Sequence, residues 1–127
     1  MKRFYKTRQA AGICVSCNEK SVTKNYCQKH RQTMVLRGRA TRARLRDEVL
    51  AGYGNKCTCC GETTRAFLTL DHVNGGGSRD RKENHAIGNK LYRGLIKRGF
   101  PSDFRILCMN CNFGRQFNNG ICPHERH

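Results

Sequence analysis

The chain has 127 residues, of which 25 are Lys or Arg and 9 are Asp or Glu, so its formal net charge is +16. Only 37% of its residues are apolar, enough for one small core or two very small modules, which are often reinforced by metal. The absence of a long apolar run excludes a signal peptide and a membrane helix, so we expect a cytoplasmic protein, not secreted, whose 9 cysteines stay reduced. The charge favours a polyanionic partner and does not by itself separate DNA from RNA, and a membrane is the least favoured partner because no basic helix with an apolar face stands out.

Two segments precede the first expected helix. Residues 1–12 are basic, and we expect them to form a poorly ordered tail. Residues 13–31 contain three cysteines and one histidine, a complete tetrahedral ligand set for structural zinc. The alternative of unconnected thiols is weak, because the polar residues between the ligand pairs could hardly become ordered without a metal. The predicted ligands of this zinc knuckle are Cys14, Cys17, Cys27 and His30.

Residues 32–52 predict an arginine-rich helix. Thr41, Leu45 and Val49 recur at every fourth position and would form its inward stripe, and Gly52 would end it. Its arginines have no acidic partner nearby for most of their run, which favours contact with phosphate over a merely solvated face. The expected nucleic-acid contacts from this helix are Arg37, Arg39, Arg42, Arg44 and Arg46.

Residues 53–127 form the second predicted module. The β-prone run 67–73 reads as a strand that leads into the glycine loop Gly75-Gly76-Gly77. Residues 89–98 predict a helix with apolar pairs four positions apart, and 104–107 predict a second short strand. A short final helix is expected to begin at the C-x2-C pair that follows this strand.

Two C-x2-C pairs bracket an Asp-His dipeptide in this module. Asp71 is a hard metal ligand beside His72, a potential general base, although the pair taken alone could be a helix cap or a buried polar pair. Asn112 could bind a cation or cap the final helix, and Arg115 lies one turn further on, where it could contact a phosphate. The bracketing thiolates can close a second tetrahedral zinc site: Cys57, Cys60, Cys108 and Cys111.

Four further residues have less certain roles. The spacing assigns Cys57 and Cys60 as one pair, so we interpret Cys59 as a spare thiol. We interpret Cys122 and His124 as parts of a terminal turn with a reduced cysteine, the alternative being a third, incomplete metal site with Cys59. His85 lies in a polar loop, and we expect it to be solvated.

The pieces CTCCGE, LTLDHV, GGG and FRILCMNCN, followed by Arg115, together resemble the HNH nuclease family over residues 53–124. The resemblance implies a small, metal-stabilised α+β protein with a ββα-metal (HNH) core and a C-x2-C zinc site. The zinc knuckle and basic helix that precede this core are similar to those of small phage-type members. That similarity suggests a phage or mobile-element origin, with the host-cell cytoplasm as the location.

The resemblance also implies a role for each matching residue. His72 would be the general base, and Asp71 would bind Mg²⁺ or Mn²⁺. Asn112 stands where the family's last histidine stands and would be the second ligand of that cation. Asp103 replaces the middle asparagine that normally orders the loop holding the base. The implied cofactors are two structural Zn²⁺ ions and one catalytic Mg²⁺ or Mn²⁺ ion.

The expected function is a DNA endonuclease that hydrolyses phosphodiester bonds. One cation and one base cut one strand, so a monomer or weak dimer would act as a nickase. One alternative, favoured by Asp103, is a catalytically silent zinc protein that binds nucleic acid. Another is a junction-resolving nuclease, which would require a dimer.

Overall fold

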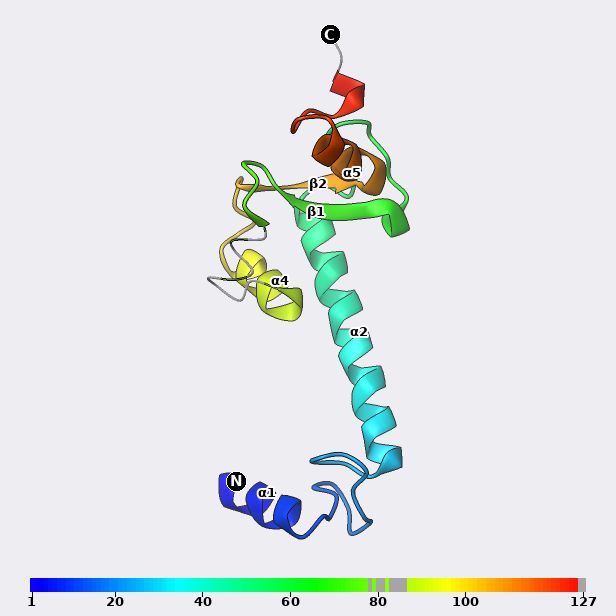
Figure 1. Cartoon of the computed structure of the whole chain (residues 1–127), viewed down its shortest axis with the longest axis vertical. Coiled ribbons are helices and arrows are strands. Elements are labelled where there is room, and N and C mark those ends of the chain that lie inside the picture. The colour runs from blue at the N-terminus through cyan, green and yellow to red at the C-terminus, as the bar shows by residue number, and fades with distance from the viewer. Residues whose placement is uncertain (78, 80–81, 83–86, 126–127) are drawn as a thin grey trace. The chain divides into compact units, whose positions relative to one another are not determined.

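The computed structural model describes residues 1–77, 79, 82 and 87–125. The chain divides into two compact units, Met1–Thr41 and Arg42–His127. Helix α2 (Gln28–Gly52) contributes residues to both units (Figure 1). Within the described residues, no helix combines the length and the apolar character needed to cross a bilayer.

The N-terminal unit begins with a helix where we expected a poorly ordered tail. Helix α1 (Lys2–Ala10) has no buried residue and no side-chain cap, so nothing in its pattern predicts it. The side chain of Arg8 attaches it to the knuckle by donating hydrogen bonds to the main-chain oxygen of Cys14 at 2.9 Å and to Asn18 Oδ1 at 2.8 Å. Tertiary hydrogen bonds thus stabilise a helix that the local sequence does not favour.

Helix α2 starts at Gln28, four residues before the predicted start at residue 32. The longer helix begins directly after Cys27 and places His30 in its first turn. In the C-terminal unit the predicted stripe residues Leu45 and Val49 are buried, as is Leu50, and the helix ends at Gly52 as predicted.

The predicted strands pair with each other in the C-terminal unit. Strands β1 (Leu68–His72) and β2 (Phe104–Cys108) form a two-stranded antiparallel sheet in which Asp71 lies opposite Arg105. The short 3-10 helix η1 (Arg65–Phe67) leads into β1, and α5 (Met109–Phe117) follows β2 without a loop and packs on both strands (Figure 1). The small α+β architecture with a two-stranded sheet is therefore confirmed.

Helix α4 (Gly88–Lys97) confirms the predicted helix and shows how it stops. Gly99 has a φ of +69°, its N–H donates to Ile96 O at 3.1 Å, and the N–H of Phe100 donates to Leu95 O at 2.9 Å. These two bonds are those of a Schellman cap. The cap turns Phe100 toward the ring of Tyr53, 5.7 Å away between centroids.

The core of this unit has two parts. Val49, Leu95 and Phe104 form one, between α2, α4 and β2. The other joins the end of α2 to the sheet and α5, and half of its buried members are cysteines: Leu50, Cys57, Leu68, Ile106, Leu107, Cys108, Cys111 and Cys122. A core built so largely from thiols is suited to ligating metal as well as to excluding water.

Candidate functional site

The N-terminal knuckle residues come together as predicted. The four donor atoms of Cys14, Cys17, Cys27 and His30 all lie within 4.8 Å of one another. Cys17 Sγ lies 3.7 Å from Cys27 Sγ, and His30 Nδ1 lies 3.5 Å from Cys14 Sγ and 3.3 Å from Cys27 Sγ. A tetrahedral zinc with Zn–S bonds of about 2.3 Å separates two sulfurs by about 3.8 Å and a sulfur from a nitrogen by about 3.5 Å. The donor set therefore fits zinc.

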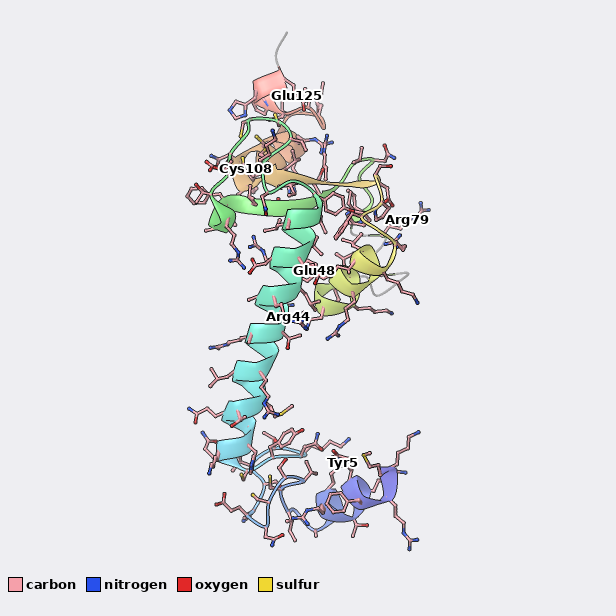
Figure 2. All side chains as sticks on the ribbon, turned by 180° about the vertical axis from the view of Figure 1, so that it is seen from behind. Tyr5, Arg44, Glu48, Arg79, Cys108 and Glu125 are labelled. Atoms are coloured by element: carbon pink, nitrogen blue, oxygen red, sulfur yellow. The ribbon has the colours of Figure 1, made fainter. Side chains whose placement is uncertain are left out.

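The second predicted set is also assembled. The sulfurs of Cys57, Cys60, Cys108 and Cys111 lie within 4.8 Å of one another, and Cys60 Sγ is 3.6 Å from Cys108 Sγ. Cys108 ends β2 (Figure 2), and its sulfur accepts the N–H of Cys111 at the start of α5. The join between strand and helix thus supplies two of the four ligands, and the turn after α2 supplies the other two.

The thiols of this set have unequal acidities. Burial raises the pKa of Cys57, but hydrogen bonds from the main chain of Cys60 and Cys108 outweigh it and lower the pKa to about 6. Burial, together with the neighbouring thiols, raises the pKa of Cys111 far above its usual value. Without a cation the crowded thiols cannot all ionise, so the arrangement suits a bound divalent metal.

A third group favours the alternative of a third metal site with Cys59 over a spare thiol and a plain turn, and it adds Cys111 to that site. Cys59, Cys111, Cys122 and His124 place four donor atoms within 4.8 Å of one another. His124 Nδ1 lies 3.3 Å from Cys111 Sγ and 3.6 Å from Cys122 Sγ. Two features of the sequence point to this third set: the adjacent cysteines at 59 and 60, and the Cys-Pro-His at 122–124. What the sequence could not show is that Cys111 belongs to both groups.

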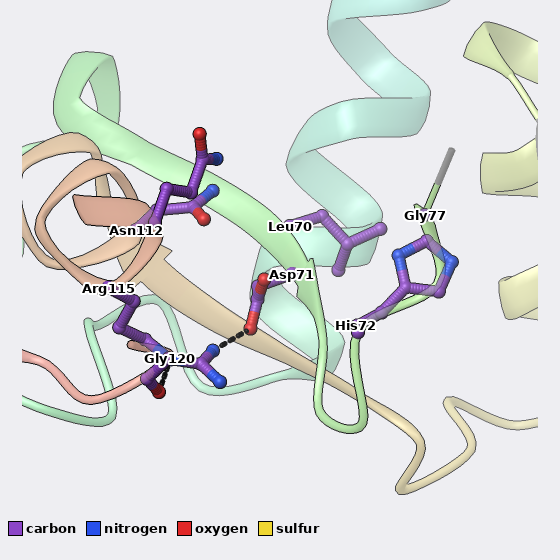
Figure 3. A pocket seen from close by; sticks show the side chains of 9 residues that line it. Leu70, Asp71, His72, Gly77, Asn112, Arg115 and Gly120 are labelled. Carbon is purple, nitrogen blue, oxygen red and sulfur yellow. Dashed lines mark hydrogen bonds and ion pairs between the residues drawn. The ribbon is translucent and has the colours of Figure 1, made fainter. Parts of the chain in front are cut away.

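The bracketed Asp-His dipeptide lies on a cleft of about 380 Å³ at the end of β1. Asp71, His72, Asn112 and Arg115 all line it, so the fold brings together four residues from β1 and α5 that the sequence singled out (Figure 3). The loop after β1 closes part of the rim. Its remaining lining residues are Leu70, Gly75, Gly77, Gln116 and Gly120.

Asp71 is held by two guanidinium groups. Its Oδ2 accepts from Arg115 Nη1 at 2.8 Å and from Arg105 Nε at 3.1 Å, and all three side chains are largely buried. Arg115 also donates through Nε to the main-chain oxygen of Gly120 at 3.0 Å. Sequence reasoning missed Arg105, whose position opposite Asp71 depends on the register of the two strands.

The donor types around Asp71 fit a hard cation. The amide nitrogen of Asn112 donates to Thr69 Oγ1 at 3.1 Å, so the amide oxygen is the atom that can face a ligand. A carboxylate and an amide oxygen are suited to Mg²⁺ or Mn²⁺, which complete their coordination with water or phosphate oxygens. The residues could therefore hold such an ion, with Arg105 and Arg115 orienting the carboxylate.

His72 points away from Asp71, toward Gly77 (Figure 3). Its ring packs on Phe104 with centroids 4.4 Å apart. A Cβ at Gly77 would lie 3.1 Å from His72 Nδ1, so the glycine gives the imidazole its room. The contact with Phe104 restrains the imidazole ring, and His72 is one of the residues that line the cleft.

The loop after His72 is attached to the main chain of Asp103. The N–H of Val73 donates to Asp103 O at 2.9 Å. The side chain of Asp103 is exposed, so this contact does not depend on its identity. The main chain of Asp103 therefore restrains this loop whatever its side chain.

The arginines of α2 differ in their surroundings. Arg37, Arg39, Arg42 and Arg44 are exposed, and Figure 2 shows Arg44 projecting from the helix. Arg46 instead donates from Nη2 to Leu68 O at 2.6 Å and to Arg65 O at 3.2 Å, so it has a structural role at the start of β1. His85 lies outside the described residues.

No family model, curated protein or solved structure matches this chain. The resemblance to the HNH family therefore rests on the residues quoted from the sequence.

Proposed function

We propose that this protein is a metal-dependent DNA endonuclease of the HNH type that nicks one strand of a duplex. The observation that carries the proposal is that Asp71, His72 and Asn112 all line one cleft, in the same unit as a four-cysteine set that fits zinc. A binding module has no need of a base and two hard ligands in the same cleft. The strand–strand–helix order of β1, β2 and α5 supports a ββα-metal core.

Each residue has a distinct task in this proposal. His72 accepts a proton from the attacking water, and its contacts with Phe104 and Gly77 hold the ring in place. A divalent cation on Asp71 and Asn112 would neutralise charge at the scissile phosphate. Arg115 contacts a non-bridging oxygen of the phosphate.

The ion pairs of Asp71 indicate how Arg115 could meet a phosphate. Arg115 and Arg105 both donate to one carboxylate oxygen, which offsets part of their positive charge. When a phosphate enters, Arg115 can exchange the carboxylate for a phosphate oxygen, since both anions accept charge-assisted hydrogen bonds from a planar guanidinium. Arg105 then keeps Asp71 in position from the neighbouring strand.

Duplex DNA is the proposed substrate because the large positive charge favours a nucleic acid and the resemblance to the HNH nucleases favours DNA among nucleic acids. The exposed arginines Arg37, Arg39, Arg42 and Arg44 offer phosphate contacts along α2. Such contacts are independent of base sequence, so we expect a sequence-tolerant enzyme.

The rival function is a zinc-stabilised nucleic-acid-binding protein without catalysis. The observation that favours it is the occupation of Asp71 Oδ2 by two arginines, which compete with a cation. The two functions differ in whether phosphodiester bonds break, so one assay separates them.

The deciding experiment is nicking of supercoiled plasmid in Mg²⁺ or Mn²⁺ by the full zinc-loaded chain. We expect the wild type to produce open circles and His72→Ala and His72→Gln to lose at least about 100-fold in rate, the lower range for a general base. His72→Gln is included because it removes the base but keeps a polar side chain of similar size against Phe104.

Zinc content and DNA affinity, measured on the same samples, provide the control. Variants that bind DNA and zinc like the wild type but do not nick support His72 as the base. If the wild type binds tightly and leaves the plasmid intact in both metals, the binding-module function replaces the nuclease.

A further inference from the structure

One buried thiol is shared between two complete ligand sets in the C-terminal unit. Cys111 is fully buried at the start of α5 and belongs both to the four-cysteine set and to the set with Cys59, Cys122 and His124. The two sets therefore offer six cysteines and one histidine in all. Seven donors are one short of two separate tetrahedral sites, but a shared thiolate gives each ion four ligands.

From this geometry we infer that the C-terminal unit holds a binuclear zinc cluster in which the Cys111 thiolate bridges both ions. One ion takes Cys57, Cys60, Cys108 and Cys111, and the other takes Cys59, Cys111, Cys122 and His124. With the N-terminal knuckle, the chain then binds three zinc ions. Two Zn²⁺ ions with six thiolates carry a net charge of about −2, which the strongly basic chain readily offsets.

The distances around the shared thiol fit this assignment. His124 Nδ1 lies 3.3 Å from Cys111 Sγ and 3.6 Å from Cys122 Sγ, close to the separation of about 3.5 Å that a tetrahedral zinc imposes on a sulfur and a nitrogen. Cys122 is fully buried and packs in the same core cluster as Cys57, Cys108 and Cys111. Ligation of a shared metal accounts for this burial, because it holds the Cys122 sulfur among the other donors of its set.

The C-terminal segment is docked where the cluster needs it. A Cβ at Gly114 would lie 2.9 Å from Pro123 Cδ, so the segment approaches the backbone of α5 closely. The short 3-10 helix η2 (Pro123–Glu125) then carries His124 to the cluster. A second zinc would hold this segment against α5 through Cys122 and His124, in addition to the contact of Pro123.

The cluster also reaches the cleft. The same segment supplies Gly120, whose main-chain oxygen accepts from Arg115 Nε, while Arg115 Nη1 holds Asp71. The second zinc would thus help to position Arg115 through the segment between Asn118 and Cys122. This link adds to the proposed nuclease but is not needed for the zinc assignment.

The first test counts zinc by native mass spectrometry on the full chain, refolded with zinc under reducing conditions. We expect three ions in the wild type and two in His124→Ala. His124→Cys supplies a thiolate in place of the imidazole and should return the count to three. Glu125→Gln, a neighbouring change in the same turn with no ligand removed, should also keep three.

The second test replaces zinc with ¹¹³Cd and records its NMR spectrum. The bridging thiolate predicts three resonances, two of which show mutual Cd–Cd coupling through the Cys111 sulfur. His124→Ala should abolish the coupling and leave the signals of the knuckle and of the four-cysteine site. These signals also show whether the variant still folds.

Three results would overturn the inference. A wild-type count of two zinc ions would mean that the two sets compete for one metal. A count of three that His124→Ala leaves unchanged would exclude His124 as a ligand. A mass lower by two hydrogens under non-reducing conditions, with Cys59 and Cys122 joined, would show a disulfide in place of the second ion.

Discussion

At the residue scale, Asp71 forms two partly buried ion pairs beside the cleft. One of its carboxylate oxygens accepts from two arginines, one on the paired strand and one on α5. Such charge-assisted bonds are stronger than neutral ones, particularly where water is partly excluded. The carboxylate therefore holds the guanidinium groups of Arg115, which lines the cleft, and of Arg105 on the paired strand.

Asp71→Asn should separate binding from catalysis. The change removes a cation ligand and releases two positive charges in the cleft. We expect nicking to fall by more than about 100-fold, since loss of residues that only support metal ligands already costs about 10- to 100-fold. DNA affinity at low salt should stay the same or rise, as measured by fluorescence anisotropy beside the plasmid assay.

Asp47→Asn is the matched control for that change. Asp47 also pairs with an arginine, Arg65, but both side chains are more than half exposed. Asp47→Asn changes the net charge by the same amount as Asp71→Asn. Because Asp47 does not line the cleft, nicking should persist. Undiminished nicking by Asp71→Asn would remove Asp71 from the catalytic site.

At the scale of elements, the end of α2 depends on the cap of α4. The Schellman turn at Gly99 directs Phe100 against Gly52, where an added Cβ would overlap the ring. Tyr53 supports the same corner, because its hydroxyl donates to Pro101 O at 2.8 Å. A glycine thus ends the helix and also makes room for a neighbouring element.

Gly52→Ala should lower the free energy of unfolding by about 1–3 kcal/mol, the usual cost of overpacking. Gly94→Ala is a control within the same unit, since Gly94 lies inside α4 with nothing within 4 Å of the added Cβ. That change should be neutral or stabilise by about 1 kcal/mol through helix propensity. Urea unfolding of both variants checks the pair, and equal destabilisation would contradict the Phe100 contact.

At the scale of the whole molecule, metal replaces much of the apolar core. The structure describes every residue of the unit Met1–Thr41, and its buried residues are Cys14 and Cys27. Both are knuckle ligands, so this unit has no apolar core of its own. The free energy of zinc binding therefore contributes directly to the folding free energy of this unit.

Removal of zinc should unfold the N-terminal knuckle first. Treatment with a strong chelator is expected to expose residues 13–31 to protease, while the cluster of Val49, Leu95 and Phe104 retains partial protection. Limited proteolysis with mass spectrometry checks the order of cleavage. A knuckle that resists cleavage after its zinc has gone would contradict a metal-dependent fold.

The overall charge predicts a strong salt dependence of DNA binding. Residues 1–41 hold 10 of the 25 basic residues and only 1 of the 9 acidic ones. Each phosphate contact adds about −0.9 to the slope of log affinity against log salt. Arg44→Gln should make the slope less negative by about 0.9, because the exposed side chain of Arg44 is expected to make one phosphate contact.

Arg46→Gln provides the comparison for Arg44→Gln. Arg46 donates to the main chain of Leu68 and Arg65, so its loss should mainly lower stability, by about 1.5–3 kcal/mol for charge-assisted bonds. Anisotropy titrations over a range of salt and unfolding curves of both variants check the difference. Identical effects of the two changes would contradict separate roles.

Most of the elements were predictable because their signals are local. The two strands, α4 and the end of α2 follow from alternation, helical periodicity and glycine caps. Helix α1 was not predictable, because the hydrogen bonds of Arg8 that hold it reach residues of the knuckle loop. Local propensity contains no information about such partners.

The sequence by itself determined which residues can bind metal, since C-x2-C and C-x2-H spacing places two donors within reach of one ion whatever surrounds them. It also determined that Asp71 and His72 stand together at the end of a strand. Only the tertiary structure decided that Arg105 faces Asp71 and that Cys59, Cys122 and His124 meet at Cys111. The physical reason is that these contacts join segments far apart in the chain, and their proximity depends on strand register and on the packing of the C-terminal turn against α5.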